Sequence, residues 1–158
     1  MSVAVVLAII LALLFAMTYF TRRRFGVLGL ALAAGSTLSS LWANDLTPWV
    51  QGAGIEIVAP PLASVVAAAI VLLPAVVLLF SGPTYKKMID RVVGAAAFSL
   101  LALAFLLPIL GDTLALVGDG KQVFDFVAKY RLWIVTGGLL FAIFDLLRVK
   151  TPRHTDKH

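Results

Sequence analysis

Long uncharged apolar runs fill most of this chain, and they constrain its fold more than any other feature. About twenty apolar residues in a helix match a bilayer hydrocarbon core of about 30 Å. Four runs have eighteen or nineteen residues, which is long enough to cross once, and a fifth run is shorter, with sixteen. The predicted spans cover residues 3–20, 25–43, 62–80, 92–110 and 132–147.

Composition agrees with a membrane environment. Hydrophobic residues make up 61% of the chain and charged residues 13%, whereas soluble domains have about 45–50% and about 25%. The net charge of +5 could indicate nucleic acid, but the basic residues border apolar runs and lack the interleaved aromatic residues of a base-stacking groove. We therefore expect a lipid bilayer with anionic headgroups as partner, together with a second copy or other membrane proteins, and no nucleic acid.

Basic clusters at alternate junctions predict the topology, because Lys and Arg are enriched in cytoplasmic loops. Five crossings with the N-terminus outside leave ten basic residues in the cytoplasm and three outside, whereas four crossings give six against seven. The sequence thus favours an all-α polytopic bundle of five spans over residues 1–150, with four spans as the alternative. Residues 151–158 would be a polar cytoplasmic tail. The predicted cytoplasmic basic face contains Arg22, Arg23, Arg24, Lys86 and Lys87.

Two segments between the runs are predicted not to cross. Residues 44–59 carry two acids, no Lys or Arg, one Pro and two Gly, so we expect an outside segment that lies in the interface or forms a short re-entrant piece. Residues 121–130 place charges on one face at positions i, i+4 and i+8. That pattern predicts an amphipathic helix in the membrane interface, with binding to a partner helix as the alternative.

Small and polar residues within the spans allow two interpretations. A stripe of small residues at every fourth position would let another helix approach closely; its members are Ala31, Gly35, Ser39 and Ala43. Ser36 and Ser40 could line a permeation path or bond to helix carbonyls, and Pro74 could act as a hinge or only bend the third run. The sequence favours helix packing and leaves Ser36, Ser40 and Pro74 as candidate pathway residues.

The chain contains no recognisable catalytic constellation. Zincin, nucleophile-elbow and P-loop spacings are missing, and the chain has no cysteine for thiol chemistry. His154 and His158 lie in the polar tail without a third ligand, so no metal site or cofactor is predicted. Asp145 stands three positions before Arg148, which predicts an intrahelical ion pair rather than a proton-carrying carboxylate. We expect a protein that is not an enzyme.

One short motif points towards a family. Residues 90–94 read Asp-Arg-Val-Val-Gly, and Asp90 suits a helix N-cap. This stretch resembles the D-R-x-x-G signature of the bacterial colicin V production (CvpA) family. Residues 22–26, Arg-Arg-Arg-Phe-Gly, resemble that family's Arg-Gly-Phe junction in permuted order. The second Gly and the Arg-Gly pair that often follow the signature are missing after residue 94. Asp90, Arg91 and Gly94 alone map onto the motif.

The resemblance, which extends from about Val3 to Leu110, implies a bacterial inner-membrane protein associated with colicin V production or export, and it brings no catalytic residues. From this resemblance and the residue patterns, the leading hypothesis is a non-enzymatic scaffold or accessory subunit in envelope maintenance or export. The alternative is a component of a small-solute or ion channel or transporter.

Overall fold

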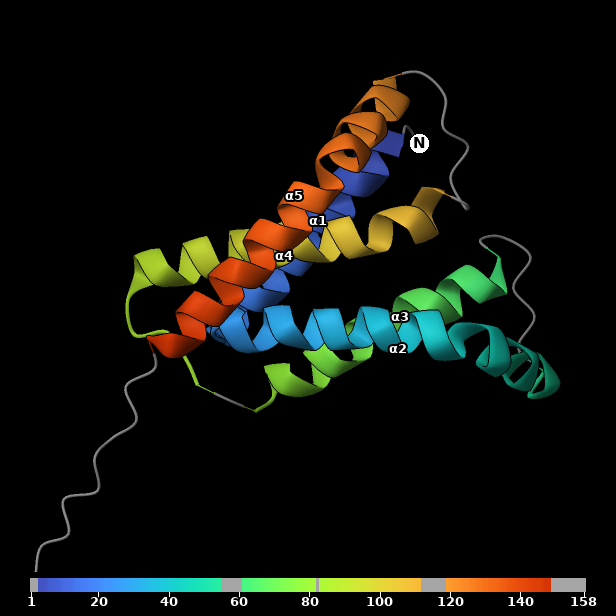
Figure 1. The fold of residues 1–158 in the computed structure, drawn as a ribbon, viewed down its shortest axis with the longest axis horizontal. Helices are drawn as coiled ribbons and strands as arrows, with labels where there is room; N and C mark the ends of the chain where they lie inside the picture. Colours follow the sequence, from blue (N-terminus) through green and yellow to red (C-terminus); the bar gives the residue numbers. More distant parts are fainter. Residues whose placement is uncertain (1–2, 55–60, 82, 112–118, 149–158) are drawn as a thin grey trace, which may run out of the picture.

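Five helices make up the part of the chain that the structure describes (Figure 1). The computed structural model describes residues 3–54, 61–81, 83–111 and 119–148. The helices are α1 (Val3–Thr21), α2 (Phe25–Gly52), α3 (Leu62–Leu79), α4 (Met88–Gly111) and α5 (Asp119–Leu147). The predicted all-α class is confirmed for the described residues.

Four of these helices are long and apolar enough to cross a membrane. They are α2, α3, α4 and the part of α5 from Phe124 to Leu147. The fifth apolar helix, Leu7–Thr21 within α1, is shorter than these four. The last apolar run, 132–147, is the shortest in the sequence, but it belongs to one of these long helices. The crossing of α1 stays a prediction.

Helices α2 and α5 extend furthest beyond the apolar runs that predicted them. α2 continues through Pro48 to Gly52, so much of the predicted interfacial or re-entrant segment belongs to this helix; residues 55–60 lie outside the described residues. α5 joins the predicted amphipathic helix and the predicted fifth span in one helix. The sequence from Lys121 to Leu132 contains neither Gly nor Pro, so nothing there interrupts the helical backbone.

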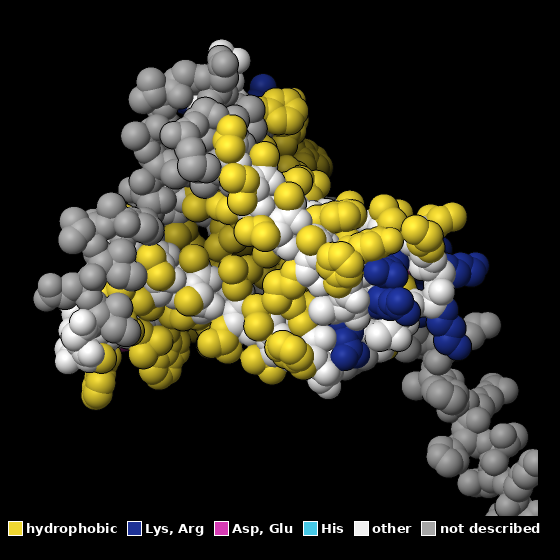
Figure 2. All heavy atoms as spheres, turned by 180° about the vertical axis from the view of Figure 1, so that it is seen from behind, with side chains coloured by type: hydrophobic (Ala, Val, Ile, Leu, Met, Phe, Trp, Pro, Cys, Tyr) yellow, Lys and Arg dark blue, Asp and Glu magenta, His cyan; other side chains and the backbone are white. Residues whose placement is uncertain are grey.

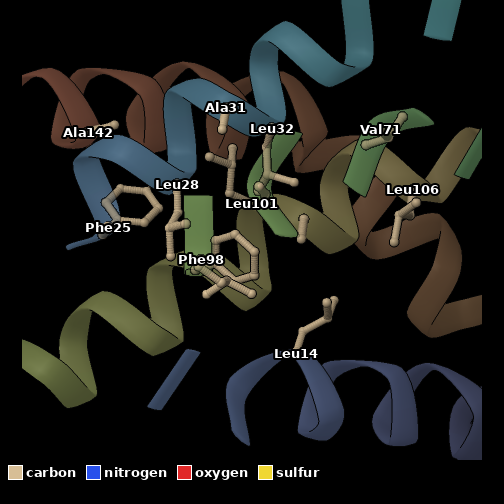
Figure 3. Packing of buried hydrophobic residues seen from close by; sticks show 13 residues of the cluster. Leu14, Phe25, Leu28, Ala31, Leu32, Val71, Phe98, Leu101, Leu106 and Ala142 are labelled. Carbon is tan, nitrogen blue, oxygen red and sulfur yellow. The ribbon is translucent and has the colours of Figure 1, made fainter. Parts of the chain in front are cut away.

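The buried core lies around α2, which packs against α3, α4 and α5. Figure 3 shows Leu28 and Leu32 of α2 beside Phe98 and Leu101 of α4, with Leu14 of α1 below them. Leu28, Leu32, Phe98 and Leu101 are buried almost completely. Because lipid is as apolar as these side chains, close packing rather than exclusion from water holds such helices together.

The small-residue stripe of α2 lies partly against α3. Gly35 is buried, and a Cβ atom there would stand only 2.2 Å from the carbonyl oxygen of Val71. Ser39 Oγ donates a hydrogen bond to the Ala67 carbonyl at 3.1 Å. Ala31 is also buried, whereas Ala43 is half-buried. The backbones of α2 and α3 thus approach closely.

Candidate functional site

Five helix ends meet at one end of the molecule, which we call the basic end. These are the C-terminal ends of α1, α3 and α5 and the N-terminal ends of α2 and α4 (Figure 1). Lys and Arg side chains gather there on the face shown in Figure 2. Two backbone hydrogen bonds join the turn before α2 to the loop before α4, from Tyr85 N–H to Arg22 O at 2.8 Å and from Arg24 N–H to Pro83 O at 3.2 Å.

A carboxylate from α5 caps the N-terminus of α2. The first N–H groups of a helix have no partner within the helix, and a negative charge there also complements the helix dipole. Gly26 N–H donates to Asp145 Oδ2 at 2.9 Å. Phe25 N–H donates to Tyr85 Oη at 3.0 Å, and Tyr85 Oη in turn donates to Asp145 Oδ2 at 3.1 Å. Asp145 and Tyr85 therefore satisfy two successive N–H groups of α2.

The partners of Asp145 differ from the predicted intrahelical pair. Its carboxylate binds donors from α2 and from the loop before α4, while the Arg148 guanidinium lies 4.3 Å from the centre of the Phe144 ring. The physical reason is that the first turn of α2 offers directed N–H donors to a carboxylate that is only 8% exposed. Sequence spacing does not reveal donors 119 residues away.

Two glycines allow this close arrangement. A Cβ atom at Gly94 would lie 2.6 Å from the Tyr85 ring, and a Cβ atom at Gly26 would lie 2.6 Å from the Ala142 carbonyl oxygen. Gly94 thus gives room to the Tyr85 ring on α4, and Gly26 lets α2 rest on α5. Residues 22–26 and residues 90–94 thus contribute to the same cluster of contacts.

Tyr85 remains a hydrogen-bond donor over a wide pH range. Burial raises the pKa of its phenol to about 12, and the neighbouring Asp145 carboxylate contributes to the increase because it opposes a second negative charge. The phenol is therefore neutral near pH 7 and keeps its proton for the bond to Asp145.

Arginines hold the C-terminal ends of α3 and α1. Arg23 donates from Nε to the Leu79 carbonyl at 2.8 Å and from Nη2 to the Phe80 carbonyl at 2.9 Å. Arg91 donates from Nε to the Tyr19 carbonyl and lies 3.9 Å from the centre of the Tyr19 ring. Cations are favourable at helix C-termini, where carbonyl groups lack helical partners.

The predicted basic face divides into two groups. Arg23 binds the end of α3, and Arg24 donates from Nη1 to the Asp145 carbonyl at 3.4 Å, so both contribute to structure. Arg22, Lys86 and Lys87 are exposed. They share with Arg91 a cavity of about 220 Å³. Its lining residues are Tyr19, Arg22, Tyr85, Lys86, Lys87, Met88 and Arg91.

A second cavity, of about 300 Å³, lies beside the Asp145 cluster. Asp90 of the motif lines it from the first turn of α4, opposite Asp145 and Arg148 of α5. The described residues contain no group of three His, Asp or Glu side chains that could hold a metal ion. His154 and His158 lie outside the described residues.

The candidate pathway residues lie away from both cavities. Ser36 Oγ donates to the Ala33 carbonyl at 2.9 Å, and Ser40 Oγ donates to the Thr37 carbonyl at 2.7 Å. Both bonds lie within α2. Pro74 is half-buried in α3, which continues as one helix to Leu79. None of these three residues lines either cavity of the basic end.

Tyr85 is the site residue that the sequence did not reveal. A tyrosine in a loop between two predicted spans has the ordinary signature of an interfacial residue. A weak signal in the sequence is Gly94, nine positions later, because a small residue at the start of an apolar helix often marks the close approach of another group.

The geometry defines an apolar all-helical bundle compatible with an integral, multi-pass membrane protein. Comparison with protein-family models finds no match, and comparisons with curated proteins and with solved structures find none either.

Proposed function

We propose that this chain is a non-enzymatic membrane scaffold or accessory subunit in envelope maintenance or export, as its resemblance to the colicin V production family implies. The observation that carries the proposal is the use of polar groups at the basic end. Asp145 and Tyr85 bind the first N–H groups of α2, and Arg23 and Arg91 bind the final carbonyls of α3 and α1. These groups fix helix positions.

This arrangement favours a structural role over catalysis. A catalytic acid, base or nucleophile must be able to reach a reacting group. Here the phenol and the carboxylate bind each other and the α2 backbone. A scaffold needs such cross-links, because the contacts maintain the relative positions of the helix ends that its partners would contact.

The alternative, a channel or transporter component, finds less support. Pathways usually need polar groups from several helices around a common cavity. Ser36 and Ser40 belong to one helix, and both hydroxyls bond to carbonyls of that same helix. Thr37 does so as well, with a bond of 3.1 Å to the Ala33 carbonyl.

The proposal includes an orientation with five crossings, the N-terminus outside and the basic end in the cytoplasm of a bacterial inner membrane. The gathering of the five helix ends supports it, because alternate crossings bring these particular ends to one side. The Lys and Arg residues at that end support the cytoplasmic assignment.

Flux measurements distinguish a scaffold from a pathway. The full chain would be reconstituted in liposomes, and K⁺ and glycerol fluxes would be compared with protein-free liposomes. We expect no added flux. A flux that Ser36→Leu/Ser40→Leu abolishes, while Thr136→Leu on α5 leaves it intact, would contradict the scaffold and support the alternative.

A further inference from the structure

The cavity of about 220 Å³ at the basic end has an unusual balance of charge. Four of its lining residues are cationic, Arg22 from the turn before α2, Lys86 and Lys87 from the loop before α4, and Arg91 from α4. Among the residues that the structure describes, no carboxylate lines it. Like charges repel one another, so an anion in this cavity would relieve an unfavourable arrangement.

The donors in this cavity suit a phosphate group. Arg91 uses Nε for the Tyr19 carbonyl, and a guanidinium has further N–H donors in a planar fork that matches phosphate oxygens. Lys86 and Lys87 add mobile ammonium groups, which bind phosphate as point charges. At about 30 Å³ for each water molecule, the cavity volume corresponds to roughly seven waters, which is enough for a phosphate and its ester oxygens.

Arg22 is held next to this cavity by an uncommon backbone conformation. Its φ angle is 57°, in the left-handed region that non-glycine residues seldom adopt. The Tyr85 N–H bond to the Arg22 carbonyl holds the turn in place. The backbone of Arg22 is thus held by the same loop that supplies the two lysines.

Large apolar side chains stand exposed close to these cations along the chain. Met88, which lines the cavity, is 69% exposed, and Ile89 beside it is 76% exposed. Phe20 at the end of α1 and Phe80 at the end of α3 are 76% and 80% exposed. Apolar groups next to basic groups are typical of the bilayer interface, where acyl chains meet headgroups. This neighbourhood favours a lipid phosphate over a phosphate free in water.

We propose that the cavity formed by Arg22, Lys86, Lys87 and Arg91 binds the phosphate of an anionic phospholipid headgroup. The site goes beyond the scaffold role and is independent of it. It also differs from general attraction to a charged surface, because it requires these side chains in this cavity.

Native mass spectrometry of the full chain in a neutral detergent tests this proposal. Phosphatidylglycerol and phosphatidylcholine would be titrated separately onto the wild type, onto Lys86→Gln/Lys87→Gln, and onto Lys121→Gln/Lys129→Gln. The last variant loses the same charge in the N-terminal half of α5, away from the basic end. We expect a preference for phosphatidylglycerol that falls on the order of tenfold or more in the first variant and persists in the second.

Equal losses in the two variants, or equal binding of the two lipids by the wild type, would overturn the site. Inorganic phosphate is a third arm. If it displaces phosphatidylglycerol at matched concentration, free phosphate is the ligand and the headgroup assignment is wrong. Because Lys86 and Lys87 are exposed, we expect the first variant to keep the thermal midpoint of the wild type. A third variant, Arg22→Gln, should also lose the preference for phosphatidylglycerol over phosphatidylcholine.

Discussion

At the scale of single residues, Gly94 determines whether the Tyr85 ring can lie on α4. A Cβ atom there would stand 2.6 Å from the ring, and the ring cannot easily move because its hydroxyl binds both α2 and α5. We expect Gly94→Ala to lower the free energy of unfolding by about 1–3 kcal/mol. Thermal unfolding in mild detergent measures the change.

Gly137→Ala is the matched control, because a Cβ atom at Gly137 meets nothing within 4 Å. It should be neutral, or stabilising by up to about 1 kcal/mol, since alanine favours the helix. An equal effect of both substitutions would contradict the proposed packing of Tyr85 on Gly94.

The Tyr85 hydroxyl makes a second prediction at this scale. Tyr85→Phe removes the acceptor of Phe25 N–H and one donor to Asp145, so we expect a loss of about 1–3 kcal/mol at neutral pH. The phenol ionises near its ordinary pKa of 10.0 in the unfolded chain and near 12 in the folded protein. As the pH rises, the phenol therefore ionises first in the unfolded chain, which favours unfolding. The stability that Tyr85 contributes is complete below pH 10 and decreases from pH 10 to 12.

Unfolding measured from pH 8 to 12 in both proteins isolates this contribution, because they share every other titrating group. The stability difference between wild type and Tyr85→Phe should shrink as the pH rises through this range. A difference that stays constant would show that the folded phenol titrates normally.

The sequence predicts some of these residues better than their partners. Asp90, Arg91 and Gly94 stand out because they form a compact polar and small motif at the start of an apolar run. The contacts of Arg91 with Tyr19 and of Gly94 with Tyr85 depend on how separate helices meet, and a single sequence does not encode that in any local period. Asp145 shows the same limit, because its nearest charged neighbour in sequence is not what its carboxylate binds.

At the scale of elements, Arg131 of α5 supplies a hydrogen-bond donor that α4 lacks. Proline has no N–H, so Pro108 leaves the Ala104 carbonyl without its usual helical donor. Arg131 Nε donates to that carbonyl at 3.0 Å. We expect Arg131→Met to cost about 0.5–1.5 kcal/mol in the wild type and less in Pro108→Ala, where alanine supplies the missing N–H.

A double-mutant cycle of unfolding free energies checks this coupling. Methionine keeps an apolar stem of similar length, so the cycle reports the hydrogen bond rather than lost packing. Equal costs of Arg131→Met in both backgrounds would show that the bond to Ala104 contributes nothing.

The boundaries of the helices also show what the sequence can predict. Apolar runs locate all five helices, because long stretches without charge satisfy their backbone internally in lipid. The junction at Arg131 misled because charge normally marks the end of a span. α5 continues through it, since the arginine finds a carbonyl of α4 and no proline or glycine interrupts the backbone there.

At the scale of the whole molecule, the basic end links all five helices. Arg91 reaches α1, Arg23 reaches α3, and Asp145 joins α5 to α2. In a membrane, residues of this end must therefore lie on one side, and the charge distribution predicts that this side is the cytoplasm. The sequence predicts that orientation from charge alone, and the gathered helix ends bear only on whether these ends share one side.

Labelling of single cysteines with a membrane-impermeant maleimide in intact cells tests this claim most directly. The chain has no cysteine of its own, so Gly54→Cys, Ser81→Cys, Gly118→Cys and Thr155→Cys each report one position. We predict labelling at positions 54 and 118 and protection at positions 81 and 155 until the cells are permeabilised. Labelling at position 81 in intact cells, or positions 81 and 155 on opposite sides, would contradict the account.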